Sequence, residues 1–277
     1  MSKPEPTPKT GYFPWAPEPI RRVAGRVKYA VRESRWHASP VGRENAARLE
    51  ALRGAHAGRR AFVIGNGPSL NAVDLGRLQG EVTIGSNGIF LKQDEGFTPT
   101  YYTVEDWLVA EDRALWITEY RGPTKLFPRD CARYLPEADD TIWVDFPRQY
   151  RGFPRFSDDF ARRAFWGGTV TFMNLQLAWH LGCTSVILIG VDHSYSVPEQ
   201  VPEDLVITSH ADDVNHFDPS YFGAGFRWHD PMVHRMELAY LEARRFAQAR
   251  GWTILNATAG GKLEVFPRVD FDDLFRR

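Results

Sequence analysis

Residues 60–70 read RAFVIGNGPSL, and this stretch decides the expected fold. Residues 62–64 are aromatic or β-branched and run directly into glycine, which predicts a buried strand followed by a tight turn. Gly65 and Gly67 let the backbone come close to a bulky anionic group, and Ser69 stands where the N-cap of a following helix is expected. The stretch predicts a phosphate- or nucleotide-binding turn, although a purely structural strand-to-helix turn fits the same residues.

A second stretch of the same kind follows about one strand–helix unit later. Residues 82–87 read VTIGSN, so another apolar run ends in glycine, Ser86 and Asn87. Asn66 stands at the corresponding place in the first stretch. Because the carboxyl ends of parallel strands meet at one edge of a sheet, these asparagines predict a polar pocket at that edge. Neither stretch has the glycine spacing of a dinucleotide-binding fold or the Gly-Lys-Ser/Thr of a Walker loop, so neither mechanism applies.

The chain beyond residue 58 alternates between strand and helix patterns. We expect strands near 61–65, 81–85, 100–104, 123–127, 141–145, 185–190 and 252–256, and helices near 69–78, 106–118, 158–164, 169–181, 231–250 and 270–275. The run VILI at 186–189 is typical of a strand buried on both faces. Residues 59–277 are therefore predicted to form one α/β, Rossmann-like domain with a mostly parallel sheet flanked by helices.

The first 58 residues have a different character. Residues 1–18 are rich in proline and are expected to be extended or disordered. Residues 20–36 interleave arginine and lysine with valine and tyrosine, which predicts a basic amphipathic helix. Such a helix can make peripheral contact with an anionic membrane, although most helices of this kind are solvated faces packed on their own domain. A further helix is expected at 42–52.

Composition limits the class of protein. The 277 residues are 43% hydrophobic and 25% charged, enough for one large core or two modest ones. A net charge of −1 provides no overall field that would attract nucleic acid. Cys131 and Cys183 lie far apart without metal-type spacing, which favours free thiols in a reducing compartment. With no long apolar run and no secretion signal, the sequence predicts a cytoplasmic protein, either free or peripheral at the inner face of the membrane.

Acidic and proton-transferring residues follow two further expected strands. Asp106 comes after the third strand, and Gly190, Asp192 and His193 come after the sixth, with Tyr195 close behind. A carboxylate at this edge can bind a hydroxyl, a ring nitrogen or a metal, and a glycine there permits close approach of a ligand. Asp106 is equally expected as the N-cap of the next helix.

Two other element ends bring polar groups toward the same edge. Gly168 and Thr169 precede the apolar helix at 169–181, where free amides suit an anion, although simple capping explains them equally well. Asn256 and Thr258 follow the last strand. These residues either bind a nucleobase or sugar, or turn the chain.

Residues 196–230 form a long polar stretch whose length predicts a lid-like insertion. Its aromatic residues argue against disorder, and such a lid can exclude water from a substrate. His229 stands just before a helix and is a candidate general base. His216 and Tyr221 are candidates for substrate contact. No metal site is expected, because the histidines and aspartates at 210–216 match no defined zinc spacing.

The motifs quoted above resemble those of a known family. Residues 64–70, 86–87, 190–192 and 256–261 are similar to motifs of the MptE-like family (DUF115). That family includes archaeal 6-hydroxymethyl-dihydropterin diphosphokinases and motility-associated (Maf) glycosyltransferases of flagellin, thought to use CMP-activated nonulosonic acids. The first three motifs also resemble bacterial sialyltransferases of glycosyltransferase family 42. The likeness spans residues 60–262 and implies a GT-A-like nucleotide fold.

The resemblance also implies roles for single residues. Asn66 and Asn87 would contact the phosphate and ribose of CMP, Thr169 would replace a serine at the nucleotide, and His229 would match the sialyltransferase base. The catalytic candidates are His229, Tyr195 and Asp192; the nucleotide-binding candidates are Gly65, Asn66, Gly67, Ser69, Ser86, Asn87, Gly168, Thr169, Gly190, Asn256 and Thr258; and the substrate-binding candidates are Asp106, His193, His216 and Tyr221. Two positions depart from the sialyltransferase pattern. Trp166 stands in place of an arginine, and Ser194 in place of a leaving-group tyrosine that the neighbouring tyrosine can replace.

The resemblance implies a glycosyltransferase that moves a nonulosonic or related keto-sugar acid from a CMP-activated donor to a cell-surface glycan or protein acceptor. It needs no obligatory cofactor, and a homo-oligomer is compatible with it. The alternative is a 6-hydroxymethyl-dihydropterin diphosphokinase that uses ATP, with Asp106 and Asp192 as Mg²⁺ ligands. A non-catalytic module that binds a nucleotide, a glycan or a membrane is a third interpretation.

Overall fold

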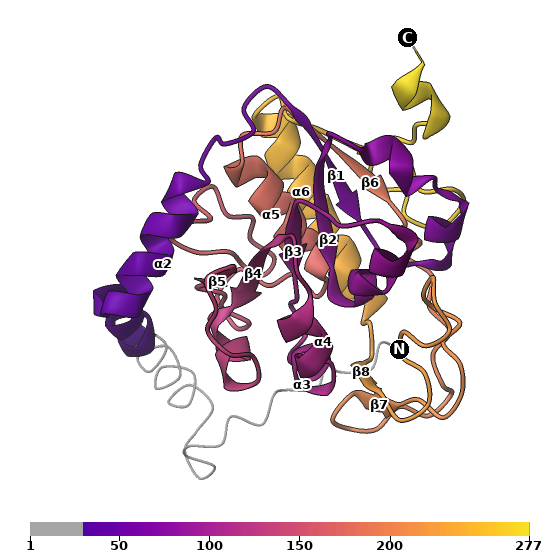
Figure 1. The fold of residues 1–277 in the computed structure, drawn as a ribbon, viewed down its shortest axis with the longest axis horizontal. Helices are drawn as coiled ribbons and strands as arrows, with labels where there is room; N and C mark the ends of the chain where they lie inside the picture. The colour runs from indigo at the N-terminus through magenta and orange to yellow at the C-terminus, as the bar shows by residue number, and fades with distance from the viewer. Residues whose placement is uncertain (1–29, 277) are drawn as a thin grey trace. The chain divides into compact units, whose positions relative to one another are not determined.

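The computed structural model describes residues 30–276, and the chain divides into two compact units, Met1–Ala46 and Ala47–Arg277 (Figure 1). In the first unit residues 30–38 are helical, as predicted for the end of the basic segment. The rest of that segment and the proline-rich stretch at 1–18 lie outside the described residues. The helix predicted at 42–52 is confirmed as α2 (Pro40–Ala51), which crosses the boundary between the units.

A parallel sheet of seven strands forms the centre of the second unit (Figure 1). The strands are β1 (Arg60–Ile64), β2 (Val82–Ser86), β3 (Tyr101–Thr103), β4 (Thr124–Pro128), β5 (Thr141–Val144), β6 (Ser185–Ile189) and β9 (Thr253–Asn256). They lie in the order β5-β4-β3-β2-β1-β6-β9, and every neighbouring pair is parallel. All seven predicted strands and the Rossmann-like α/β fold are confirmed.

The order of the strands reverses at β1. The chain moves outward from β1 through β2 to β5, and then returns to place β6 on the other side of β1. The register pairs Arg60 with Ser185 and Ile64 with Ile189, so the two strands end side by side. In open α/β sheets the crevice beyond such a reversal is the usual ligand site.

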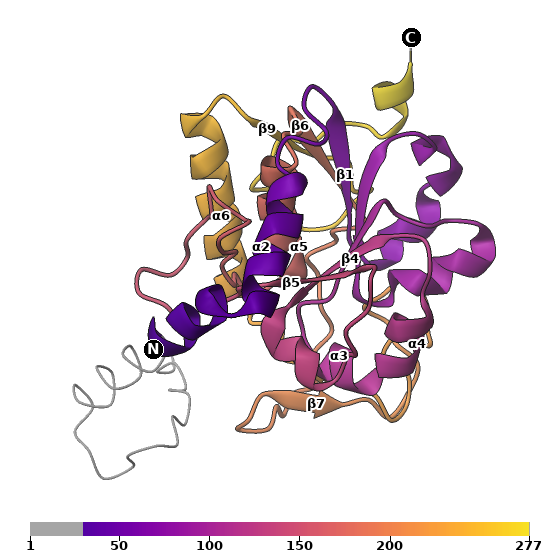
Figure 2. The ribbon, with the colours of Figure 1, turned by 60° about the vertical axis from the view of Figure 1, so that its left-hand side comes forward.

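The two faces of the sheet are covered differently. Ala61 and Val63 belong to a core shared with α5 (Val170–His180) and α6 (Val233–Ala249), which lie on one face (Figure 2). Phe62 points to the opposite face, because side chains alternate along a strand, and its ring stacks on Phe275 of the C-terminal turn η5 (Asp272–Phe275). None of the described helices has the length and apolar composition needed to cross a membrane.

Of the six helices predicted beyond residue 58, two are confirmed and four differ, among them the one at 270–275, which is the 3₁₀ turn η5. The helices at 169–181 and 231–250 appear as α5 and α6. The helix predicted at 106–118 is two short helices, α3 (Trp107–Asp112) and α4 (Ala114–Glu119). The stretch at 69–78 forms two 3₁₀ turns, η1 (Pro68–Ala72) and η2 (Leu75–Leu78), and further 3₁₀ segments are η3 (Asn87–Glu95) and η4 (Arg129–Arg133). The predicted helix at 158–164 is wrong, because those residues form turns.

Local hydrogen bonds explain the missing helix. The Ser157 hydroxyl donates to the carbonyl of Arg163 and accepts from the Asp159 amide, which closes a compact loop. The buried side chain of Gln176 on α5 accepts from the backbone amides of Ser157 and Phe165. The backbone groups at both ends of this stretch are therefore bonded to side chains rather than to a helical turn.

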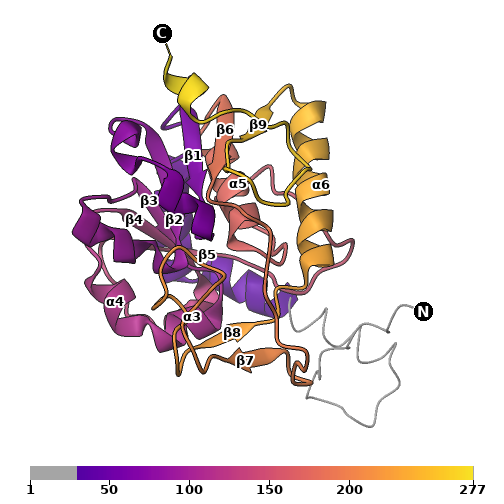
Figure 3. The same ribbon diagram turned by 90° about the vertical axis from the view of Figure 1, so that its right-hand side faces the viewer.

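Residues 205–230 are not wholly irregular. They contain an antiparallel hairpin of β7 (Val206–Thr208) and β8 (Arg227–His229), with Val206 opposite His229 (Figure 3). The hairpin lies beside α3, and the Arg227 guanidinium is paired with Asp112. Each strand has three residues, too few for a clear alternating pattern. Opening and closing of this segment as a lid stays a prediction.

Candidate functional site

The parallel strands bring the predicted site residues to one edge of the sheet. Asp106 follows β3, Asn87 follows β2, residues 65–69 follow β1, residues 190–195 follow β6, and residues 256–258 follow β9. Neighbouring strands lie about 4.8 Å apart, so the ends of β3 and β6 are separated by roughly 14 Å. The predicted site residues are therefore spread along the edge rather than gathered at one point.

The glycines that end β1 and β6 pack against each other. The Gly65 amide donates to the carbonyl of Ile189 at 2.8 Å, and the Gly67 amide to that of Gly190 at 2.9 Å. A Cβ on Gly65 would lie 2.3 Å from the carbonyl oxygen of Gly190, which no side chain tolerates. Close approach of the two backbones thus explains why glycine stands at this strand end.

Asp192 joins the two turns at the reversal. Its carboxylate accepts from the Ser69 hydroxyl at 2.6 Å and from the Ser69 amide at 3.3 Å, and it fills the space where Gly67 lacks a Cβ. Its carbonyl accepts from the Lys262 amide at 2.7 Å. The side chain predicted as catalytic therefore has a structural hydrogen-bonding role in this geometry.

Asn66 and Asn87 lie at neighbouring strand ends and share an unusual feature. The Asn66 Nδ2 donates to the carbonyl of Ser86 at 3.1 Å, so its orientation is set and its Oδ1 is left over. The buried Oδ1 atoms of both asparagines have no hydrogen-bond partner among residues 30–276. Since buried acceptors are normally paired, these two oxygens suit a ligand that donates hydrogen bonds, such as a hydroxyl or an amino group.

The segment at 213–222 packs over the end of β2. The hydroxyl of Tyr221 accepts from the Gly88 amide at 3.1 Å, and a Cβ on Gly88 would lie 2.3 Å from the tyrosine ring. The His216 ring stacks on Tyr221 with centroids 3.9 Å apart, and its Nδ1 lies 2.7 Å from Oδ2 of Asp213. The Phe217 amide donates to the carbonyl of Asn66. Two predicted substrate residues therefore hold this segment against the asparagine subsite.

His229 and Asp106 form a hydrogen-bonded pair at the end of β3. The Nδ1 of His229 lies 3.0 and 2.9 Å from the two oxygens of Asp106, whose Oδ1 also accepts from the Leu108 amide as N-cap of α3. The N-cap interpretation of Asp106 is confirmed, and binding of a ligand by its carboxylate stays a prediction. The Trp107 ring packs edge-on against the imidazole, with centroids 5.4 Å apart. Nδ1 is engaged, which leaves Nε2 as the nitrogen that can meet a substrate.

The charges around His229 favour its protonated form. Burial lowers the pKa of His229, but the hydrogen bond that His229 donates to Asp106 and the negative charges of Asp106 and Glu105 outweigh burial, so the net shift of the pKa is upward. The side chain is 32% exposed, which keeps it accessible from solvent. A histidine held by a carboxylate on one nitrogen and accessible on the other can accept a proton from a hydroxyl.

A second group lies beside β6 and the two long helices. His193 is buried, which lowers its pKa, and its Nε2 lies 3.8 Å from Oε1 of Glu237, whose charge acts against that lowering. Its ring packs against Tyr240 of α6, whose hydroxyl lies 3.5 Å from that of Thr169, the N-cap of α5. Gly168 precedes this cap with a positive φ of 83°. The Tyr195 hydroxyl lies 3.8 Å from the sulfur of Met236 and so belongs to the same group.

Asn256 and Thr258 make their hydrogen bonds within the protein. Asn256 donates to the carbonyl of Leu263 at 2.9 Å and accepts from the Thr258 amide at 3.0 Å. The Thr258 hydroxyl accepts from the Val191 amide at 3.1 Å. Both side chains are buried and tie the last strand to the loop after β6.

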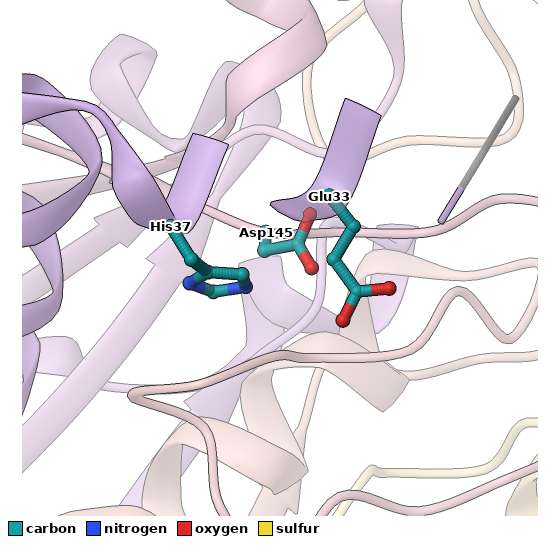
Figure 4. Close-up of side chains that lie close together, drawn as sticks. All are labelled: Glu33, His37 and Asp145. Atoms are coloured by element: carbon teal, nitrogen blue, oxygen red, sulfur yellow. The ribbon is translucent and has the colours of Figure 1, made fainter. Parts of the chain in front are cut away.

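Residues of metal-binding type are found in both units. Glu33 and His37 lie one turn apart on the helix of the first unit, and Asp145 follows β5 in the second (Figure 4). Within the described part of the second unit alone, no three histidine, cysteine or acidic side chains bring ligand atoms together. Cys131 and Cys183 are buried free thiols.

Two residues beside the His229–Asp106 pair were not predicted from the sequence as site residues. They are Glu105, which immediately precedes Asp106 after β3, and Arg148. The Arg148 guanidinium donates to the Glu105 carboxylate at 3.0 Å and to the Glu105 carbonyl at 2.7 Å. Arg148 lies in an irregular loop after β5, 43 residues away along the chain, and no local pattern marks it.

The fold and this edge define a class: a Rossmann-like α/β protein whose polar side chains gather at the carboxyl end of a parallel sheet, at the point where the strand order reverses. A family profile described as 6-hydroxymethylpterin diphosphokinase MptE-like matches residues 42–198, more than half of the chain. The protein belongs to the MptE-like family, as the resemblance implied. No curated protein matches the chain. The family is compatible with a nucleotide-related transferase; the matched region includes Asn66, Asp106 and Asp192 but ends before His229.

Proposed function

We propose that the protein is a glycosyltransferase that moves a nonulosonic or related keto-sugar acid from a CMP-activated donor to a glycan or protein acceptor. The observation that carries the proposal is the pair of His229 and Asp106 at the carboxyl edge of the sheet. Sugar transfer to a hydroxyl requires a base at the acceptor and binding groups at the nucleotide, and this edge offers both types of residue.

The pair supplies the proton transfer. The acceptor hydroxyl gives its proton to Nε2 of His229 while its oxygen bonds to the anomeric carbon of the donor. The bond between that carbon and the phosphate oxygen breaks, and CMP leaves with the electron pair. Asp106 holds Nδ1 and stabilises the imidazolium that forms.

The nucleotide subsites follow from the remaining groups on the edge. The unpaired Oδ1 atoms of Asn66 and Asn87 accept from the ribose hydroxyls or the amino group of cytosine. This assignment differs from the expected asparagine–phosphate contact, because the remaining amide atoms are acceptors and a phosphate dianion donates no hydrogen bond. Thr169, at the start of α5, is the group we assign to the phosphate.

Nucleotide binding tests the proposal first. Thermal shift measurements with CMP, CDP, UDP, GDP and ATP, with and without Mg²⁺, should give the largest rise in melting temperature with CMP, because a ligand that binds only the native state stabilises it. His229→Ala should abolish transfer while leaving CMP binding largely intact. His210→Ala, in the same segment but assigned no role, is the matched control. A preference for ATP with Mg²⁺, or equal loss of binding and turnover in His229→Ala, would contradict this assignment.

The diphosphokinase is the second candidate, and the description of the matching family favours it. In that reaction the hydroxymethyl oxygen of the pterin attacks the β-phosphorus of ATP, its proton passes to His229, and AMP leaves. Mg²⁺ would bind Asp106 and Asp192, but the strand ends that carry them are roughly 14 Å apart, so one ion reaches both only if a loop moves. Formation of AMP that requires the pterin alcohol and stops with EDTA would establish this reaction instead.

Other expectations remain proposals. A cytoplasmic location, membrane contact through residues 20–36, a glycan or protein acceptor and a homo-oligomer each need their own experiment. Turnover with any activated donor would exclude the purely binding module. Sedimentation with vesicles of anionic lipid, with and without the first 36 residues, tests the membrane contact.

A further inference from the structure

The first turn of α6 carries an arginine that packs against two aromatic rings. The guanidinium carbon of Arg235 lies 5.0 Å from the centre of the Phe153 ring and 4.8 Å from the centre of the Trp166 ring. Both rings belong to the loop between β5 and α5, and all three side chains are partly exposed. These three side chains form the Arg235 cluster, which a ligand can reach from solvent.

The charge of Arg235 is not neutralised by a neighbouring carboxylate. Among residues 30–276 no carboxylate lies within ion-pair distance of its guanidinium, and the one side-chain hydrogen bond is a contact of 3.9 Å from Nη1 to the sulfur of Met232. An aromatic ring attracts the positive charge but is not an acceptor for the N–H groups in the plane of the guanidinium. The cluster therefore orients the guanidinium and leaves its donors available to a ligand.

The segment that carries the two rings has an excess of positive charge. Residues 150–166 contain four arginines and two aspartates. Both aspartates are paired with arginines outside the segment, Asp158 with Arg250 and Asp159 with Arg53. An anion that approaches the Arg235 cluster therefore meets positive charge that the segment itself does not compensate.

The cluster lies beside the start of α5. A Cβ on Gly168 would lie 3.7 Å from the Cβ of Arg235, and Thr169, the next residue, is the N-cap of α5. The hydroxyl of Tyr240, on the same helix as Arg235, lies 3.5 Å from the Thr169 hydroxyl. The chain enters α6 shortly after β8, the strand that ends at His229 (Figure 3). Arg235 is therefore close to the residue that we assign to the phosphate of the donor.

We propose that the Arg235 cluster is an anion-binding site that holds two oxygens of one acidic group of the substrate. A guanidinium donates two parallel N–H groups to a carboxylate or a phosphate, and no neutral group offers the same pair of charged acceptors. A CMP-linked sugar acid has two such groups, its phosphate and its carboxylate. That the anion is part of a sugar nucleotide rests on the proposed function, but the presence of an anion site at Arg235 does not.

NMR of the arginine side chains tests the site directly. The Nε–Hε signal that disappears in Arg235→Gln belongs to Arg235. In the wild-type protein this signal should shift with CMP but not with cytidine if the site holds the phosphate. It should shift with N-acetylneuraminic acid but not with its methyl ester if the site holds the carboxylate. Equal shifts with the charged and the neutral member of each pair, or no shift with CMP, the sugar acid and inorganic pyrophosphate, would overturn the proposal.

Calorimetric titration of the same ligands gives the size of the effect. Arg235→Gln should weaken binding of the anion that shifts the signal roughly tenfold or more, because a charged hydrogen bond is lost, and should leave binding of the neutral analogue unchanged. Arg235→Lys keeps the charge without the paired donors and should fall between the two. The matched control is Arg250→Gln at the other end of α6, where the guanidinium carbon lies 3.7 Å from the centre of the Phe246 ring.

The outcomes separate this proposal from the proposed function. Equal affinities for the anion in Arg235→Gln and Arg250→Gln would overturn the anion site, and so would an equal loss of affinity for the charged and the neutral ligand, which indicates a purely structural role. A signal shift and a loss of affinity that are confined to pyrophosphate would support the anion site and contradict sugar transfer.

Discussion

The contact between Gly67 and Asp192 allows a quantitative test of the turn after β1. Gly67 has φ −69° and ψ 163°, a conformation open to alanine, so substitution creates no backbone strain. However, the new Cβ would lie 1.9 Å from Oδ2 of Asp192. The carboxylate must swing away in Gly67→Ala, and its hydrogen bonds with Ser69 are lost.

The size of the effect follows from those bonds. A hydrogen bond to a charged group contributes about 1.5–3 kcal/mol, and the contact of Asp192 with the Ser69 amide is long and adds little. Gly67→Ala should therefore lower the free energy of unfolding by about 2 kcal/mol. For a unit of this size that corresponds to a fall in melting temperature of roughly 4–8 °C. Asp192→Ala should cost about the same, because it removes the same bonds.

Urea unfolding of a double-mutant cycle is the decisive assay. Once Asp192 is alanine, the Cβ at residue 67 meets no carboxylate. The double variant should therefore lose little more free energy of unfolding than either single variant, which corresponds to a coupling energy of about 2 kcal/mol between the two positions. The control is Gly223→Ala, where the added Cβ would lie 3.4 Å from its nearest neighbouring atoms, and it should change the free energy of unfolding by less than about 0.5 kcal/mol. Additive costs would refute this reasoning. If Gly67→Ala instead leaves the stability unchanged but abolishes nucleotide binding, the glycine serves to let a ligand approach the backbone.

Two further predictions concern the edge and the hairpin. Asp106→Asn keeps an oxygen that accepts from the Leu108 amide but loses the charge that raises the pKa of His229. A raised pKa stabilises the folded state below the pKa of the unfolded state, and this stabilisation is lost as the pH rises through the pKa of the folded state. The substitution should therefore lower the free energy of unfolding more near pH 5.5 than near pH 8.5. An equal cost at both would contradict it. Arg113→Met removes the hydrogen bonds that the guanidinium donates to the carbonyls of residues 220 and 221. Protease cleavage between residues 213 and 226 should therefore accelerate roughly tenfold or more. The control Arg121→Met changes an exposed side chain and should leave the rate of cleavage unchanged.

Much of the fold could be predicted because its signals are local. Each strand is a short apolar run that ends in glycine or a polar residue, and the long helices at 169–181 and 231–250 carry enough turns to be recognised. The short helices were predicted wrongly because their bounds depend on contacts with distant residues. The expected helix at 106–118 breaks at Arg113, whose buried side chain is bonded to distant carbonyls and packs 3.6 Å from the Phe226 ring. The spacing of apolar residues along a helix gives no information about such a contact.

The candidate site divides in the same way. The sequence by itself determined which residues stand at the carboxyl ends of the strands, since parallel topology brings those ends to one edge whatever the side chains do there. Only the tertiary structure decided their partners. Asp106 meets His229, and Ser69 meets Asp192, each across 123 residues of chain. Hydrogen bonds and buried charges depend on positions in space, and a linear pattern of apolar and polar residues records only neighbours along the chain.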